Sequence, residues 1–238
     1  MGGADEALVT LTEGEIEVLG LLPYSSNYTF LARVTTADAQ VHAVYKPRSG
    51  ERPLWDFPHG TLAAREVAAW MVSEASWKIV PTTVLRPDAP LGEGSLQLFI
   101  EHDPERHYFA LMESRLDELA AFAAFDAVIN NADRKAGHVI EDAGGRMCAV
   151  DHGLTFHTDH KLRTVIWTFA EAKLTPEVRG VLGGLASALD DAGGLGGELA
   201  ALLTPAEAAA TLERVEELLA EDRFPSPQGD RHLPWPLI

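Results

Sequence analysis

Two apolar stretches near the start of the chain have the pattern of β-strands. They are residues 19–34 and 41–47, and the polar segment 35–40 between them is expected to form a turn. Side chains in the second stretch alternate with the two-residue period of a half-exposed strand. Pro47 ends this stretch because proline cannot donate a hydrogen bond to a neighbouring strand. The pattern predicts a pair of neighbouring strands.

The next segments predict a helix and two more strands. Residues 61–77 have the spacing of an amphipathic helix, with Thr61 as the expected N-cap. Residues 79–87 and 94–102 are strand-like stretches on either side of a turn rich in Pro and Gly. Residues 1–103 are therefore expected to form a small antiparallel sheet that carries one helix.

Helical patterns dominate the rest of the chain. Residues 112–131 form a long one, for which Ser114 is the expected N-cap. Thr175 and Thr204 are each followed by Pro, a combination typical of helix starts, and Thr204 also begins a capping box. The Gly-rich segment 191–197 is expected to separate the two helices that start at these threonines.

These patterns together predict an α+β fold in two parts. Residues 1–103 hold the sheet and residues 104–238 hold most of the helices, while the Pro-rich stretch 224–238 is not expected to be helical. With 238 residues and 46% apolar content, the chain can bury a substantial core.

Charge and composition limit the partners of the chain. The formal net charge of −17 repels phosphate backbones and anionic lipids, so we expect neither nucleic-acid binding nor stable membrane association. The beginning of the sequence is acidic and lacks the pattern of a secretory signal, and no apolar run approaches membrane-spanning length. Cys148 lies in an apolar run and is expected to be a buried, inert thiol. We expect a cytoplasmic protein.

Three polar residues are expected to converge at a short hairpin. Residues 138–141 and 147–150 are apolar runs joined by the turn DAGGR. If the turn is centred between its two glycines, the numbers of facing residues sum to 289, so His138 and Asp151 are cross-strand neighbours with Cβ atoms about 5 Å apart. Asp133 lies in the loop just before the hairpin. The pattern predicts two acids and a histidine around one point, and the His138–Asp151 separation suits two ligands of one cation.

The same residues carry a resemblance to a known family. The stretch Asp133–His138, followed by Asp151-His152-Gly153, resembles the D-R-x-x-x-N and D-F-G motifs of the phosphatidylinositol 3-/4-kinase-like branch of the protein-kinase superfold. HipA-type bacterial kinases belong to that branch, and the whole chain resembles a small bacterial family named for such a domain. The resemblance implies a two-lobed protein-kinase-like fold, with the sheet in the N-lobe and most helices in the C-lobe.

The resemblance also implies an activity. The protein is expected to be an ATP-dependent phosphotransferase whose acceptor is a protein hydroxyl or a small-molecule alcohol. Asp133 would orient or deprotonate the accepting hydroxyl, whereas Asp151 and His138 would hold Mg²⁺ or Mn²⁺ at the nucleotide phosphates.

A lysine and a glutamate match further parts of the family pattern. Lys46, at the end of a predicted strand, matches the lysine that contacts nucleotide phosphates. Glu66 is the expected partner of Lys46. It lies four residues from both Leu62 and Trp70, so its carboxylate borders the apolar face of the predicted helix.

Two further segments are assigned to the nucleotide by the resemblance. The turn containing Ser25, Ser26 and Asn27 takes the place of the phosphate-covering loop, where hydroxyls and backbone N–H groups can bind phosphate. Phe99 and Ile100 lie where a hinge between the lobes would offer backbone groups to adenine.

Departures from the family motifs leave alternatives open. His138 replaces Asn and His152 replaces Phe, and imidazole is a poorer ligand for Mg²⁺ than an oxygen atom. A second metal would then be weakly held, replaced by Mn²⁺ or absent, or His138 would donate a hydrogen bond to a phosphate. Alternative functions are an ATP-binding pseudokinase or sensor, an AMP transferase on the same fold, and a metal-dependent hydrolase. The hydrolase would use His138, Asp151, His157 and His160.

Overall fold

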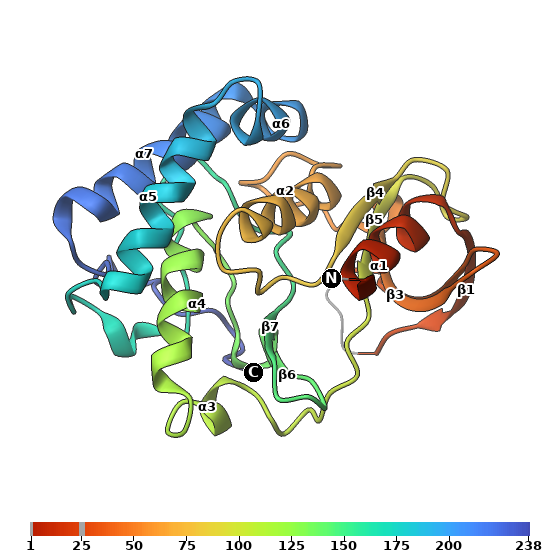
Figure 1. Cartoon of the computed structure of the whole chain (residues 1–238), viewed down its shortest axis with the longest axis horizontal. Coiled ribbons are helices and arrows are strands. Elements are labelled where there is room, and N and C mark those ends of the chain that lie inside the picture. The colour runs from red at the N-terminus through yellow and green to blue at the C-terminus, as the bar shows by residue number, and fades with distance from the viewer. Residues whose placement is uncertain (1, 24–26) are drawn as a thin grey trace.

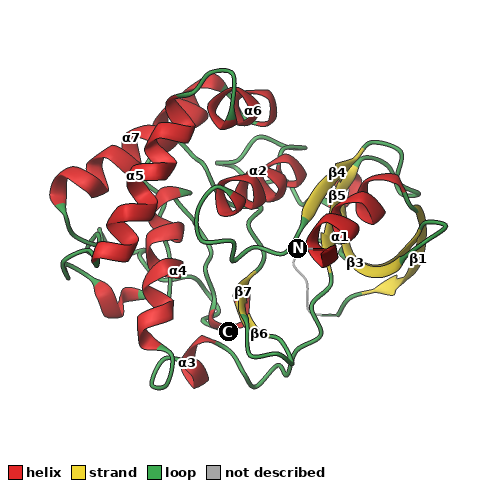
Figure 2. Ribbon diagram, viewed as in Figure 1, coloured by secondary structure: helices red, strands yellow, loops and turns green. Residues whose placement is uncertain are grey.

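The computed structural model describes residues 2–23 and 27–238. Within this part of the chain, five antiparallel strands form one sheet in the order β1-β2-β3-β5-β4 (Figures 1 and 2). The strands are β1 (Glu15–Leu21), β2 (Phe30–Thr35), β3 (Gln40–Pro47), β4 (Thr83–Arg86) and β5 (Gly94–Leu98). The antiparallel sheet predicted from the sequence pattern is confirmed, but the stretch 19–34 is divided between two strands, β1 and β2, and β1 begins earlier than expected.

β3 presents different side chains on the two faces of the sheet. Ala43 and Tyr45 are buried in a core on one face, whereas Val44 and Lys46 line a cavity on the other. Strand alternation therefore points the predicted phosphate-binding lysine away from the core. On the neighbouring strand, Gly94 passes so close to the Lys46 carbonyl that a Cβ atom there would clash with it.

A helix that the sequence pattern did not predict covers the core face of the sheet. α1 (Gly2–Glu13) buries Leu11, and Leu8 packs partly buried beside it against the same core. The two leucines lie one helical turn apart and form a narrow apolar stripe. The acidic residues and glycines around this stripe hide it in the sequence.

The predicted helix of the N-lobe is α2 (Leu62–Glu74), which lies between the two lobes (Figure 1). It packs against β4 and β5 on one side and a helix of the C-lobe on another. Thr61 is the N-cap residue of this helix, as expected, but its side chain makes no capping hydrogen bond, because its hydroxyl donates to the Pro58 carbonyl instead. Glu51 takes over the capping role by accepting hydrogen bonds from the N–H groups of Gly60 and Leu62, at 2.6 and 3.0 Å.

Helices make up most of the C-lobe (Figure 2). They are α3 (Tyr108–Leu111), α4 (Leu116–Val128), α5 (Pro176–Asp190), α6 (Leu195–Leu202) and α7 (Pro205–Glu221). Their apolar faces share one large core with α2. Within the described residues, no helix is long and apolar enough to cross a membrane. The α+β division is confirmed, while the exact boundary after residue 103 stays a prediction.

Helix starts in the C-lobe test the capping predictions. Thr175 and Thr204 both cap their helices, accepting hydrogen bonds from the N–H groups three residues later at 3.3 Å. Ser114 does not cap α4, because the helix starts later, with Arg115 at the N-cap position. The Gly-rich segment 191–197 is only partly a separator, since α6 begins within it.

The predicted hairpin is present with a different register. β6 (Val139–Glu141) pairs with β7 (Met147–Ala149), and the numbers of paired residues sum to 288. The turn is therefore centred on Gly144, and the His138 carbonyl accepts a hydrogen bond from the N–H of Val150 at 3.0 Å. The expectation that His138 and Asp151 face each other in the ladder is wrong by one residue.

Candidate active site

A cavity of about 750 Å³ opens between the sheet and the C-lobe. β3, α2 and the segment after β5 line one side, and the loops around the β6–β7 hairpin line the other. The predicted site residues that line this cavity are Asn27, Lys46, Glu66, Phe99, Ile100, Asp133, His138 and Asp151. The predicted residues Ser25 and Ser26 lie outside the described part of the chain.

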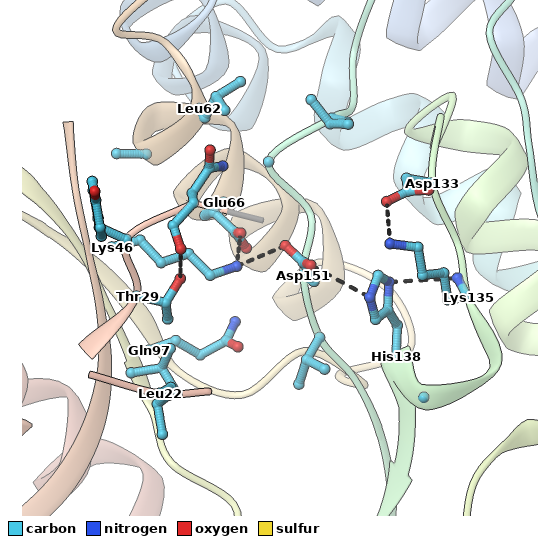
Figure 3. Close-up of a pocket in the computed structure, with 18 of the residues that line it drawn as sticks. Leu22, Thr29, Lys46, Leu62, Glu66, Gln97, Asp133, Lys135, His138 and Asp151 are labelled. Atoms are coloured by element: carbon cyan, nitrogen blue, oxygen red, sulfur yellow. Dashed lines mark hydrogen bonds and ion pairs between the residues drawn. The ribbon is translucent and has the colours of Figure 1, made fainter. Parts of the chain in front are cut away.

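Lys46 connects the two lobes by ion pairs. Its Nζ atom donates one hydrogen bond to Oε1 of Glu66 and another, 2.8 Å long, to Oδ1 of Asp151 (Figure 3). Burial disfavours the charged amine, but the two carboxylates outweigh it and raise the pKa of Lys46 above its ordinary value. Burial also opposes ionisation of Asp151, yet Lys46 and His138 hold the pKa of Asp151 well below its ordinary value. The amine and the carboxylate are therefore both charged at neutral pH.

Glu66 is held inside the protein and not on its surface. Its side chain is only 3% exposed. While Oε1 accepts a hydrogen bond from Lys46, Oε2 accepts one from the N–H of His152 at 2.9 Å. One carboxylate thus ties α2 to β3 and to the chain that follows β7. The contact between Glu66 and Lys46 that the sequence pattern favoured is present.

His138 and Asp151 meet although they are not paired in the hairpin. Nε2 of His138 lies 3.4 Å from Oδ2 of Asp151. His138 ends the 3₁₀ turn η2 (Ala136–His138), and Asp151 has a left-handed backbone with φ of 61°. Non-glycine residues rarely adopt this conformation. Both residues therefore lie outside the regular ladder, where the backbone directs their side chains toward each other.

The contacts of His138 define its tautomer. The N–H of Lys135 donates to Nδ1 of His138 at 3.4 Å, so Nδ1 is unprotonated and the proton is on Nε2. Burial lowers the pKa of His138 to about 4 against the attraction of Asp151, so the ring is neutral at pH 7. Nε2–H therefore points at the Asp151 carboxylate. In this tautomer, His138 positions Asp151 and has no lone pair to offer a metal on that side.

Asp133 lies at the far end of this line of polar side chains (Figure 3). Nζ of Lys135 lies 3.1 Å from its Oδ2, and its own N–H donates to Oδ1 of Asn131 at 3.0 Å. Burial raises the pKa of Asp133, with Lys135 opposing this effect. A raised pKa makes a carboxylate a better proton acceptor. Sequence reasoning did not select Lys135, and its signal was its position two residues after the predicted catalytic acid.

A buried ion pair beneath the site holds its loops together. The side chains of Arg134 and Asp126 are fully buried and lie 2.9 Å apart. Arg134 also donates to the carbonyls of His138 and Val150, at 3.2 and 2.8 Å. One guanidinium thereby fixes both strands of the hairpin at the end where His138 and Asp151 lie. Sequence reasoning missed this pair, although a lone acid on the apolar face of a predicted helix was an available signal.

The predicted hinge keeps two backbone groups open. The N–H of Phe99 donates to the His42 carbonyl at 2.9 Å, and the Ile100 carbonyl lies 2.8 Å from Nδ1 of His102. Among the described residues, no hydrogen-bond partner contacts the Phe99 carbonyl or the Ile100 N–H. These two groups belong to one trans peptide and point in opposite directions, so one of them at a time can face the hydrogen-bonding edge of a nucleobase.

The donor set of the site limits which metal it can hold. The described part of the chain has no group of three or more His, Cys, Asp or Glu residues placed to hold a metal ion. His157 packs against Phe57, and neither His157 nor His160 lines the cavity. The four-residue site of the hydrolase alternative is therefore not formed. Mg²⁺ commonly binds one or two carboxylates together with substrate phosphates, an arrangement that Asp151 fits and the tautomer assigned to His138 does not.

Comparison with known proteins places the chain in a family. It is 38% identical over 268 residues to Protein Rv2133c of Mycobacterium tuberculosis (strain ATCC 25618 / H37Rv), an alignment that covers 98% of this chain and 95% of that protein. The chain belongs to the family of Protein Rv2133c. The name of that relative states no activity. No protein-family model matches the sequence.

A solved structure shows which fold this Rv2133c family member has. The crystal structure of the Helicobacter pylori proinflammatory kinase CtkA superimposes with a TM-score of 0.53, covering 89% of this chain and 94% of that one. Sequence identity is 8%, so the likeness concerns the fold alone. It confirms the predicted two-lobed, kinase-like fold. The narrower assignment to the phosphatidylinositol 3-/4-kinase-like branch stays a prediction.

Proposed function

We propose that the protein is an ATP-dependent phosphotransferase of the phosphatidylinositol 3-/4-kinase-like superfamily. One observation carries the proposal: Lys46, paired with both Glu66 and Asp151, shares a single cavity with Asp133. This arrangement supports phosphoryl transfer because it combines a fixed cation for phosphate oxygens, a carboxylate for a metal and a second carboxylate for a proton. The kinase-like fold supports it further.

ATP would lie across the cavity from the hinge to the hairpin. The Phe99–Ile100 peptide would offer one backbone group to adenine, and Lys46 would contact phosphate oxygens as a point charge. Asn27 lies on the same wall and would contribute near the phosphates. Asp151 offers carboxylate oxygens to Mg²⁺ or Mn²⁺, which would neutralise charge on the phosphates when bound.

The transfer step requires an aligned hydroxyl. Asp133 would hold the acceptor hydroxyl and take its proton as the hydroxyl oxygen bonds to the γ-phosphorus. The bond between the γ-phosphorus and the bridging oxygen breaks at the same time, and ADP leaves with that electron pair. The products are a phosphate ester and ADP. The acceptor is a protein hydroxyl or a small-molecule alcohol.

Replacing Lys46 with Met tests the proposal. Loss of one fixed charge from the phosphates should lower ATP turnover about 100-fold or more, measured as labelled phosphate transferred or released from γ-labelled ATP with Mg²⁺ or Mn²⁺. Lys173→Met is the matched control, because that lysine is 78% exposed and its one ion pair among the described residues is with Asp222. Normal turnover in a folded Lys46→Met protein would refute the assignment. Parallel reactions with α-labelled ATP would expose AMP transfer instead.

An ATP-binding sensor without transfer is the second candidate. The observation that favours it is the tautomer of His138, which points a proton and not a lone pair toward Asp151. A sensor should bind ATP with Lys46 intact and transfer no label to any acceptor in a cell extract. Transfer that disappears in an Asp133→Asn variant supports the phosphotransferase.

A further inference from the structure

The segment 232–238 is anchored to the C-lobe beside the candidate active site. The carbonyl of His232 accepts hydrogen bonds from the N–H of Thr164 at 3.2 Å and from Nε1 of Trp167 at 3.0 Å. The rings of Trp167 and His232 also pack edge to face. Thr164 in turn bonds through its hydroxyl to Asp126 of the buried ion pair. The start of the segment is therefore tied to the scaffold that holds the site.

The end of the segment is bonded to the catalytic loop itself. The Leu237 carbonyl accepts a hydrogen bond from the N–H of Ala136 at 2.8 Å, and the Leu237 side chain packs against the main core. Pro234 is buried. Ala136 lies between Asp133 and His138 in the sequence, so this bond fixes the segment on the loop that carries both. Figure 1 shows this end of the chain beside β6 and β7.

Two side chains of the segment face the cavity. Pro236 and Ile238 both line it. Cγ2 of Ile238 lies 4.0 Å from the point that a Cβ atom on Gly137 would occupy. Ile238 remains 62% exposed, so it presents apolar surface to the cavity and to solvent instead of filling a core. The residues proposed to bind ATP come from the other wall, and the segment borders the loop of Asp133.

We propose that Pro236 and Ile238 form the acceptor-side wall of the cavity and select a hydroxyl carried on an apolar group. This inference rests on the proposed function. A hydroxyl-rich acceptor such as a sugar or inositol would place its hydroxyl groups against these two side chains. Neither side chain can form a hydrogen bond, so those hydroxyl groups would lose their bound water and gain no partner in return. An acceptor with an aliphatic neighbour beside its hydroxyl loses no hydrogen bonds there and buries apolar surface.

A thiol placed in the wall tests the inference. Cys148 is the only natural cysteine and is buried, and burial raises the pKa of its thiol, so an Ile238→Cys variant carries one reactive thiol. Leu233→Cys is the matched control, because Leu233 is 45% exposed on the same segment and does not line the cavity. Each variant is assayed before and after modification with a bulky maleimide, and mass spectrometry verifies a single adduct.

Two measurements are made on each protein: ATP affinity by calorimetry, and transfer from γ-labelled ATP to seryl peptides with Leu or Gln beside the serine. Wild type should favour the Leu peptide about tenfold. The adduct at residue 238 should lower transfer about tenfold or more while the Kd for ATP changes less than about twofold. The adduct at residue 233 should change neither.

The outcomes separate this inference from the proposed function. Three results would each overturn the inference. They are unchanged transfer with the adduct at residue 238, an ATP affinity that falls in step with transfer, and a wild-type preference for the Gln peptide. Labelling of neither peptide by a wild type that binds ATP would also overturn the inference. Absence of ATP binding by wild type would instead refute the proposed function.

Discussion

Replacing Asp126 with Asn should destabilise the protein strongly, because Asp126 neutralises Arg134 in a fully buried pair. Its carboxylate also accepts hydrogen bonds from Nδ2 of Asn131 at 3.0 Å and from Oγ1 of Thr164 at 3.1 Å. Every one of these partners is a donor. Asn keeps the shape of the side chain but removes its charge and turns one acceptor into a donor that faces other donors. The guanidinium of Arg134 is then buried without a countercharge.

The size of the effect follows from this burial. Breaking a buried ion pair by removing one partner costs about 3–5 kcal/mol, a large fraction of a typical folding free energy of about 5–15 kcal/mol. In a domain of this size about 1 kcal/mol shifts the Tm by about 2–4 °C, so the Tm should fall by about 6–20 °C. Glu17→Gln is the control, because Glu17 pairs with Arg33 at 3.1 Å on the exposed surface. That change should cost no more than about 1 kcal/mol.

Urea unfolding followed by circular dichroism measures the free energy of unfolding of both variants and the wild type. The double variant Asp126→Asn with Arg134→Met should recover part of the loss, because no charge is then left buried alone. A loss in Asp126→Asn below about 1 kcal/mol, or equal to that in Glu17→Gln, would show that this pair does not hold the loops of the site as argued.

Two further predictions concern pH. The kcat/KM for ATP turnover should have an acid limb above the ordinary pKa of aspartate, because burial raises the pKa of Asp133 and its role as proton acceptor is lost as the pH falls through that value. A pH–rate profile checks this prediction, and an acid limb at the ordinary pKa of aspartate would contradict it. The protein should also lose stability between pH 6.5 and about 4, because His138 stays neutral in the fold while the unfolded chain takes up a proton. In urea titrations over this pH range, the free energy of unfolding of His138→Asn should fall less than that of the wild type. An equal fall in both proteins would contradict the assignment of this pH dependence to His138.

Signals within a few residues of each other predicted much of the fold. Thr175 and Thr204 capped the helices that they were expected to cap, because an N-cap depends only on the hydroxyl and the first helical turn. Thr61 takes the predicted N-cap position, but its side chain makes no capping bond, for a reason outside that window. Glu51, eleven residues before Leu62, instead accepts hydrogen bonds from the N–H groups of Gly60 and Leu62, and no local pattern predicts this contact.

Contacts between distant segments could not be predicted in the same way. Arg134 was visible only as part of a motif, and its partner Asp126 and its bonds to the hairpin depend on the folded path of the chain. Leu237 contacts Ala136 across about a hundred residues of sequence. The energy of such contacts comes from burial and from completed hydrogen bonds between distant segments. Neither leaves a repeating pattern of residues in the sequence from which the contact could be predicted.

The pairing of His138 with Asp151 was predicted for a reason that the structure corrects. A one-residue error in register normally moves a side chain to the opposite face of a hairpin, so the two residues should have been separated. They remain 3.4 Å apart because neither lies in the ladder: His138 ends a 3₁₀ turn, and Asp151 has a φ of 61°. Arg134 bonds to the carbonyls of His138 and Val150 and so fixes both strand ends together. The motif spacing therefore reports the geometry of the loops beyond the strands, and it is more informative about the site than the turn-derived register from which the contact was first inferred.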